Sequence, residues 1–293
     1  MLSSSTKTVL TPIQRASFSS FKFNHLIQEI KALFRRLVLQ SCRRSSFLVA
    51  GLVQPLLWLV LFGSLFQKST FPVFSNKIIY YDDFLGSGIV VFTAFTSSLN
   101  AGLPIMFDRE FGFFNRLLVV PITSRLSIVI ASFYHIVSIT AFQMFTISII
   151  TVMKNKTHIS IGFNELIYGT FILLLLICLV TVISIVLAFI LSGHIELLAL
   201  ILLINLPILF SSTALAPLTF MPAWLRIIAM INPLTYAIES LRHIMIFDHF
   251  VPDQKTISTV FGILSVLDIV LYFSILNICT FFLANRFFQK KLE

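Results

Sequence analysis

The stretch DREFGFFNRLLVVP, residues 108–121, separates two long apolar segments and sets the pattern of the whole chain. It carries four charged residues within nine positions, whereas the flanking segments at 88–107 and 126–153 carry none. Each flanking segment has at least the ~20 residues that a helix needs to cross the hydrocarbon core of a bilayer. The stretch is therefore predicted to be a short polar connection between two membrane spans.

The composition is that of a membrane protein. Of the 293 residues, 57% are hydrophobic and 11% are charged, which is more apolar than an average soluble domain. The net charge of +9 does not indicate a nucleic-acid partner, because the basic residues lie in short segments between apolar runs. Cys42, Cys178 and Cys279 are too widely spaced to indicate a disulfide framework or a metal site.

Six apolar segments predict an all-α membrane protein with a six-span domain at 47–293. They lie at about 47–66, 88–107, 126–153, 166–191, 197–218 and 259–284. The third and fourth are longer than the hydrocarbon core requires and are expected to tilt. The fifth contains Pro207 and Pro217, which membrane helices tolerate when neighbouring groups satisfy the freed carbonyls.

The region before the first span is predicted to form a tail and an amphipathic helix. Residues 1–23 are rich in Ser and Thr and resemble an organelle transit peptide, but a retained flexible tail is the favoured interpretation. Within 24–46, Leu26, Ile30, Leu33 and Leu37 recur at helical spacing. A basic amphipathic helix directly before a span is expected to lie in the membrane interface, with its cations among lipid phosphates.

The basic residues also predict the orientation. With six spans, both termini share one side with the loops at 108–125 and 192–196. That side holds 14 of the 21 Lys and Arg residues, and the opposite side holds seven. By the positive-inside rule both termini are expected to be cytoplasmic or on the equivalent side of an organelle membrane.

The chemistry of residues 108–121 alone leaves two interpretations open. Asp108 is a candidate helix cap, Arg109 and Arg116 share a helical face, and Gly112 would let another surface approach closely. Pro121 closes the stretch before the next span. These features suit either a docking surface or a short interfacial loop whose arginines only hold the topology.

The same residues resemble the Arg-Glu-x-Gly loop of the ABC-2 type transporter permeases, the membrane subunits of a class of ATP-binding-cassette exporters. The similarity rests on Arg109, Glu110, Gly112, Leu117, Leu118 and Pro121, and it departs from the common pattern at Phe113 and Asn115. The resemblance implies a cytoplasmic coupling helix that docks on an ATPase subunit. The coupling residues that it implies are Arg109, Glu110, Gly112, Arg116 and Pro121.

A second stretch resembles the segment before the last span in the same family: MPAWL at 221–225 and INPLTYAIESLR at 231–242. Asn232 is a good helix cap, and Pro233 suits the first helical position. The helix that follows is too short and too charged to span, so it is expected to be re-entrant or interfacial. The resemblance implies an outer gate that contains Asn232, Pro233, Tyr236, Glu239 and Arg242, whereas the residues alone favour a structural ion pair between Glu239 and Arg242.

Polar residues inside the spans also have two interpretations. Thr93, Ser97 and Asn100 lie on or near one face of the second predicted span, and Asn205 and Ser211 lie in the fifth. Such stripes hold helices together more often than they contact a substrate. The resemblance nevertheless implies that these two spans line the path between two permease subunits, so all five residues are candidates for path lining.

The chain shows no pattern for catalysis or for energy coupling of its own. None of its ten glycines is followed by Lys, so the Gly-Lys-Ser/Thr phosphate loop is missing. His194 with Glu196 is a weak metal signal, and a solvated loop is the favoured interpretation. Asp268 in the last predicted span is expected to make a structural hydrogen bond. We therefore expect no catalytic residue, metal or cofactor on this chain, with ATP-Mg bound by a separate ATPase subunit.

The resemblance thus implies a permease subunit that pairs with a second copy or with a similar permease. Two alternatives stay open: a non-transporting membrane assembly or anchor protein, and, less favoured, a membrane-embedded lipid-modifying enzyme. Overall character and the 32 phenylalanines of an AT-biased composition resemble the plastid-encoded permeases of red algae and their cyanobacterial relatives. This implies a plastid membrane with stromal termini, or else a bacterial inner membrane with cytoplasmic termini, and no residue identifies the substrate.

Overall fold

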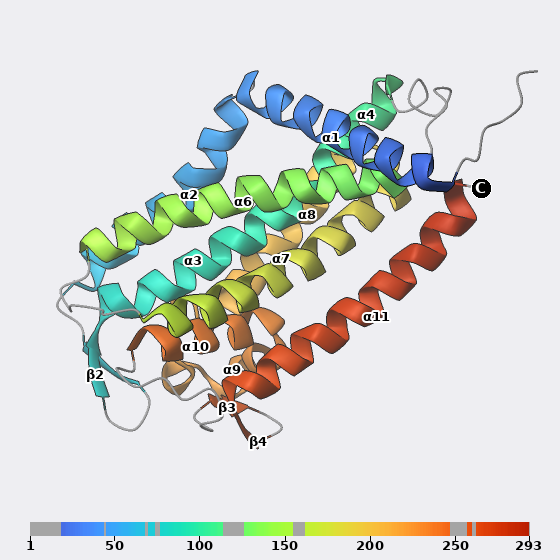
Figure 1. The fold of residues 1–293 in the computed structure, drawn as a ribbon. Helices are drawn as coiled ribbons and strands as arrows, with labels where there is room; N and C mark the ends of the chain where they lie inside the picture. Colours follow the sequence, from blue (N-terminus) through green and yellow to red (C-terminus); the bar gives the residue numbers. More distant parts are fainter. Residues whose placement is uncertain are drawn as a thin grey trace, which may run out of the picture.

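A computed structural model describes residues 19–43, 45–67, 70–73, 77–113, 126–154, 162–246, 257–259 and 262–292. Figure 1 shows these residues as a bundle of long helices. The long helices are α1 (Ser19–Arg43), α2 (Ser45–Leu65), α3 (Tyr81–Leu99), α6 (Leu126–Lys154), α7 (Phe163–Ile190), α8 (His194–Phe210) and α11 (Val266–Leu292). The short ones are η1 (Asn100–Gly102), α4 (Leu103–Glu110), η2 (Leu218–Phe220), α9 (Ala223–Ile231) and α10 (Pro233–Ile246).

The predicted helical class is confirmed, but the protein also contains two short antiparallel hairpins that were not predicted. Strands β1 (Thr70–Val73) and β2 (Lys77–Tyr80) form the first, and β3 (Ile257–Thr259) and β4 (Gly262–Leu264) form the second. Figure 1 places β2, β3 and β4 toward one end of the bundle, while the C-terminus, the start of α1 and the end of α4 lie at the other.

Four of the described helical segments are long and apolar enough to cross a membrane. They are Tyr81–Glu110, Ser127–Thr151, Phe163–Ile190 and Val266–Phe288, and two shorter apolar helices lie at Gly51–Leu65 and His194–Phe210. The chain is therefore a multi-pass helical membrane protein. The six predicted segments correspond to these four long helices and two shorter ones.

Two helix ends differ from the predicted spans for local reasons. Helix α8 ends at Phe210, because the hydroxyl of Ser212 donates to the Leu209 carbonyl at 2.7 Å and accepts from the Ala214 amide at 3.3 Å. Helix α11 begins only at Val266. There the Ser265 amide donates to Asp268 Oδ2 at 2.9 Å and the Asp268 amide donates to Ser265 Oγ at 3.2 Å, which is the pattern of a capping box.

This cap corrects the depth of Asp268. The residue lies in the first turn of α11, not a third of the way into a span. Its predicted structural hydrogen bond is confirmed, because the carboxylate accepts from both the amide and the hydroxyl of Ser265.

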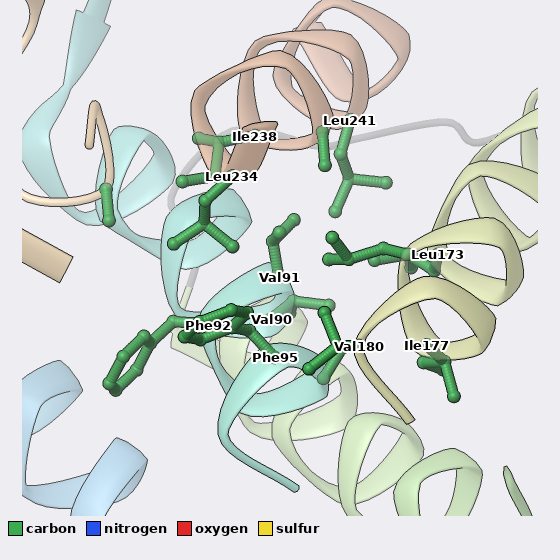
Figure 2. Packing of buried hydrophobic residues seen from close by; sticks show 14 of the residues in the cluster. Val90, Val91, Phe92, Phe95, Leu173, Ile177, Val180, Leu234, Ile238 and Leu241 are labelled. Atoms are coloured by element: carbon green, nitrogen blue, oxygen red, sulfur yellow. The ribbon is translucent and has the colours of Figure 1, made fainter. Parts of the chain in front are cut away.

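Helix α3 forms the centre of the bundle and is buried along nearly its whole length. Helices α2, α6, α7 and α10 all contact it, and Figure 2 shows its side chains meeting those of α7 and α10. A small residue also lets the turn after α8 approach α3 closely, since a Cβ on Gly88 would lie 2.6 Å from the Ala214 carbonyl oxygen. The labelled contacts are Val90, Val91, Phe92 and Phe95 of α3 with Leu173, Ile177 and Val180 of α7 and Leu234, Ile238 and Leu241 of α10.

The amphipathic helix α1 packs on protein along part of its predicted apolar stripe. It begins at Ser19 among the described residues, before the predicted boundary at 24, and it contacts α6. Leu37 is buried, Leu33 packs in a cluster with Ile128, and Ser41 hydrogen-bonds His135 at 2.9 Å. Leu33 and Leu37 of the predicted apolar stripe are therefore covered by protein, and the placement of α1 in the membrane interface stays a prediction.

Candidate functional site

The predicted coupling segment begins at the end of α4, which continues the central helix α3 through η1. Gly112 has a φ of +71° and follows the last residues of α4, and its amide donates to the Arg109 carbonyl at 3.3 Å. This left-handed conformation is the usual way to end a helix and favours glycine. A Cβ at Gly112 would meet no atom within 4 Å, so its predicted use in close docking stays a prediction.

Arg109 joins the end of α4 to the end of α7. Its guanidinium donates from Nη1 to the Ala188 carbonyl and, at 3.4 Å, to the Leu191 carbonyl. The last carbonyls of a helix have no partner within the helix and carry partial negative charge. The Arg109 guanidinium therefore supplies a hydrogen-bond donor to the carbonyls at the end of α7 and holds the end of α4 beside them.

Glu110 joins the same turn to the start of α8. Its carboxylate accepts from the His194 amide at 3.0 Å and pairs with His194 Nδ1. A negative charge is favourable here, because the first amides of a helix are unpaired and carry partial positive charge. The ring of Phe107 also lies 5.2 Å from the His194 ring.

This contact gives His194 a role that its sequence context did not reveal. The spacing of His194 and Glu196 suggested a solvated loop or a weak metal signal, whereas the structure pairs His194 with Glu110 and Glu196 with the amide of Ser192 at 3.0 Å. Among the described residues, no group of three or more His, Cys, Asp or Glu side chains is arranged to hold a metal ion.

Asp108 connects the segment to α1. The structure overturns its predicted role as a helix cap, because Asp108 lies in the last turn of α4 and accepts from Arg36 Nη2 at 2.6 Å. The same guanidinium lies 3.7 Å from the centre of the Phe113 ring, a cation–π arrangement. Three helices thus hold the end of α4: α1 through Arg36, α7 through its last carbonyls and α8 through His194.

The remaining predicted coupling residues fall beyond this point. Arg116 and Pro121, together with Leu117, Leu118 and Asn115 of the family pattern, lie outside the described residues.

The second motif lies at the junction of α8, α9 and α10. The predicted cap is confirmed, since Asn232 Oδ1 accepts from the Leu234 amide at 3.0 Å at the start of α10. The Asn232 amide nitrogen also donates to the Ile208 carbonyl at 2.9 Å and to Ser211 Oγ at 3.2 Å. Tyr236 donates from its hydroxyl to the Met230 carbonyl at 2.5 Å, so this motif joins the end of α8 to both helices around Pro233.

Arg242 is buried inside the bundle rather than on a polar helix face. It is 1% exposed and donates from Nη2 to the Thr213 carbonyl at 2.9 Å and the Phe84 carbonyl at 3.3 Å. Its Nη1 pairs with Glu239 Oε1 at 2.5 Å, and its guanidinium lies 3.6 Å from the Phe84 ring centre. The predicted structural ion pair is therefore present, and it ties α10 to α3 and to the turn after α8.

The candidate path residues make contacts that join helices or stay within one helix. Thr96 donates to Asn205 at 3.1 Å between α3 and α8, and Thr140 of α6 donates to Ser97 at 2.9 Å. Thr93, Asn100 and Ser211 donate to carbonyls of their own helices. Of the five candidates, Thr93 and Asn205 are buried, and Ser97, Asn100 and Ser211 are half-buried. Their contribution to a transport path stays a prediction.

Residues 28–246 match the family model described as "ABC-2 type transporter", and the chain belongs to this family. It is a membrane subunit of a transporter and not an enzyme.

Relatives from three algae carry the printed name "Putative transport permease ycf38". The chain is 44% identical to that of Pyropia yezoensis over 284 residues, covering 97% of both chains. It is 44% identical to that of Porphyra purpurea over 289 residues, covering 99% of this chain and 98% of the relative. It is 51% identical to that of Cyanophora paradoxa over 227 residues, covering 78% and 76%.

Proposed function

We propose that this chain is the membrane-spanning permease subunit of an ATP-binding-cassette exporter and that a separate ATPase subunit drives it. The family match supports a permease, and the shorter helices α2 and α8 would complete six spans together with the four long ones. In this proposal ATP-Mg is bound by the partner, and this chain binds no cofactor.

The observation that carries the proposal is the anchored turn at the end of α4. Next to the paired Glu110 and His194, the apolar side chains of Phe111 and Ile195 are 73% and 72% exposed. Exposed aromatic side chains beside charged groups are typical of a docking surface for another protein. A movement of this turn, driven by a bound partner, would be transmitted directly to α1, α7 and α8. Arg36 connects the turn to α1, Arg109 connects it to α7, and Glu110 connects it to α8.

The membrane arrangement is part of the same proposal. The excess of basic residues on the side of the termini favours a stromal location of this end in a plastid membrane, or a cytoplasmic one in a bacterium. The algal relatives favour the plastid. Two permease subunits, identical or similar, would enclose the path, and the region of Asn232 and Arg242 would form the gate on the far side.

Co-purification from native membranes in a mild detergent tests the proposal. We expect an ATPase subunit to be recovered with this chain, and a Glu110→Lys variant to lose that subunit or its transport-coupled activity while keeping its helical fold. Recovery of the chain without any ATPase, under conditions that preserve other ATP-binding-cassette complexes, would overturn the proposal. An unchanged Glu110→Lys complex would instead favour an assembly or anchor protein.

A further inference from the structure

The junction of α1, α4 and α6 contains two cavities that share Gln40. The inner cavity, about 80 Å³ in volume, lies between the three helices and is lined by Leu37, Gln40, Ser41, Leu103, Pro104, Phe107, His135, Ile136 and Ile139. The outer cavity, about 410 Å³, has described lining residues from α1 alone: Arg36, Leu39, Gln40 and Arg43. The outer cavity is bordered by Arg36 and Arg43, the inner one by the buried His135, and Gln40 lines both.

The polar group at the inner end is His135, which is 2% exposed. Its Nε2 lies 2.9 Å from Ser41 Oγ, and its Nδ1 is buried with no hydrogen-bond partner among the described residues. A buried imidazole nitrogen without a partner is costly. A ligand oxygen in the inner cavity would remove that cost if the Ser41 hydroxyl donates to Nε2 and the Nδ1–H donates to the ligand.

The rim is cationic on one face of α1. Arg36, Gln40 and Arg43 are spaced by four and three residues and therefore lie on the same helical face. Arg36 donates from Nη2 to Asp108, which leaves its other guanidinium N–H groups available to a ligand. Arg43 is exposed and has no hydrogen-bond partner among the described residues. Arg43 also lies just before α2, where a chain enters the membrane at the level of the lipid headgroups.

We infer that these two cavities form a binding site for one anionic phospholipid. The phosphate would accept hydrogen bonds from Arg43, Arg36 and the Gln40 amide in the outer cavity. The inner cavity has room for a small polar group only, so it would take an ester carbonyl of the glycerol backbone against His135, while the acyl chains stay in the bilayer. Because Arg36 also pairs with Asp108, the bound lipid would hold α1 against the turn at the end of α4.

The site is independent of the proposed ATPase partner, so it can be tested on the purified full-length chain alone. The probes are phosphatidylglycerol, phosphatidylcholine and inorganic phosphate, each added to the delipidated chain in detergent. Thermal unfolding and native mass spectrometry report binding. We expect phosphatidylglycerol to raise the Tm and to remain bound, and the other two probes to do neither.

Two variants and one control locate the site. Arg43→Gln should weaken phosphatidylglycerol binding about fivefold or more, since ~1 kcal/mol per basic residue near a lipid surface corresponds to that factor. Gln40→Leu should weaken it about 2- to 10-fold, the range for the loss of one hydrogen bond. Arg35→Gln, on the same helix but outside both cavities, should stay within about twofold of the wild type, because an exposed charge away from the ligand contributes little.

Equal weakening in Arg35→Gln and Arg43→Gln would overturn the site in favour of diffuse attraction to the helix. Wild-type binding by either Arg43→Gln or Gln40→Leu would also overturn it. A Tm increase with inorganic phosphate that matches the one with phosphatidylglycerol would replace the lipid by a free anion. Failure of the ATPase co-purification would leave all of these results unaffected.

Discussion

Glu110 and His194 are 84 residues apart in the chain, yet the Glu110 carboxylate accepts from the His194 amide at 3.0 Å and pairs with His194 Nδ1. The contact fixes the start of α8 to the end of α4. At its other end α8 is bonded to Asn232 through the Ile208 carbonyl at 2.9 Å. One helix therefore contacts both of the motifs that the family resemblance singled out.

Removing the Glu110 carboxylate should loosen the start of α8. In Glu110→Ala, we expect the His194 amide to exchange its hydrogen about 2- to 10-fold faster, the range for the loss of one hydrogen bond. Glu196→Ala is the control, because Glu196 bonds the Ser192 amide of its own turn and not α4. Hydrogen exchange resolved to single amides separates His194 from Ser192, and an equally faster His194 amide in the two variants would contradict the interpretation.

Replacing Arg242 should destabilise the whole bundle. Arg242→Met leaves Glu239 and two buried carbonyls without their cation, so we expect a loss of about 3–5 kcal/mol in the free energy of unfolding. The same change at the exposed Arg226, which among the described residues donates to the nearby Met221 carbonyl at 3.4 Å, should cost less than about 0.5 kcal/mol. Unfolding in mixed detergent micelles measures both, and equal costs would show that the buried contacts contribute nothing.

Gly88 should tolerate no side chain. A Cβ there would lie 2.6 Å from the Ala214 carbonyl oxygen and 2.8 Å from the Ala214 Cα, and backbone atoms cannot move aside without shifting the helix or the turn after α8. We expect Gly88→Ala to cost about 1–3 kcal/mol of unfolding free energy. Gly169→Ala is the control, since its nearest neighbour is the flexible Leu241 Cδ1 at 3.2 Å. A Tm loss in Gly169→Ala as large as in Gly88→Ala would contradict this account.

The Thr96–Asn205 contact separates the structural from the path-lining interpretation. If the 3.1 Å hydrogen bond holds α3 to α8, Thr96→Val should cost ~0.6–2 kcal/mol of stability, the range for such bonds between membrane helices. Thr146→Val, which removes a hydroxyl bonded within its own helix at 2.9 Å, should cost less. An unchanged Tm with altered transport in Thr96→Val would instead favour a path-lining role for Asn205.

The exposed Phe111 should be required for the ATPase partner and dispensable for the fold. We expect Phe111→Asp to reduce the recovery of ATPase in co-purification at least fivefold, the low end of the loss when an aromatic anchor is removed from an interface. Phe163→Asp changes a 78% exposed phenylalanine at the start of α7, away from the α4 turn, and should leave recovery unchanged. Equal losses would argue against docking at Phe111.

Local features could be predicted from the sequence because they depend on neighbours in the chain. Asn232 was predicted to cap a helix, and its Oδ1 accepts from the Leu234 amide two residues later. The cap at Ser265 and Asp268 was missed, although both residues are close in sequence, because the apolar run from 259 onward resembled a span. The hairpin at 257–264 was missed for the same reason, whereas the hairpin at 70–80 lies between two predicted spans, where no strand was predicted.

The length and apolarity of its segments determined that this chain is a helical membrane protein, since crossing a bilayer requires about 20 apolar residues in succession. The charges of Arg109 and Glu110 suited either a docking surface or a loop that holds the topology, and the family resemblance favoured docking, which stays a prediction. Only the tertiary structure decided which groups these charges and Asp108 meet, because Arg36, the last carbonyls of α7 and His194 come from distant helices. Arg242 shows the same limit: the sequence suggested a pair with Glu239, but the packing of α10 on α3 buries it against Phe84 and Thr213.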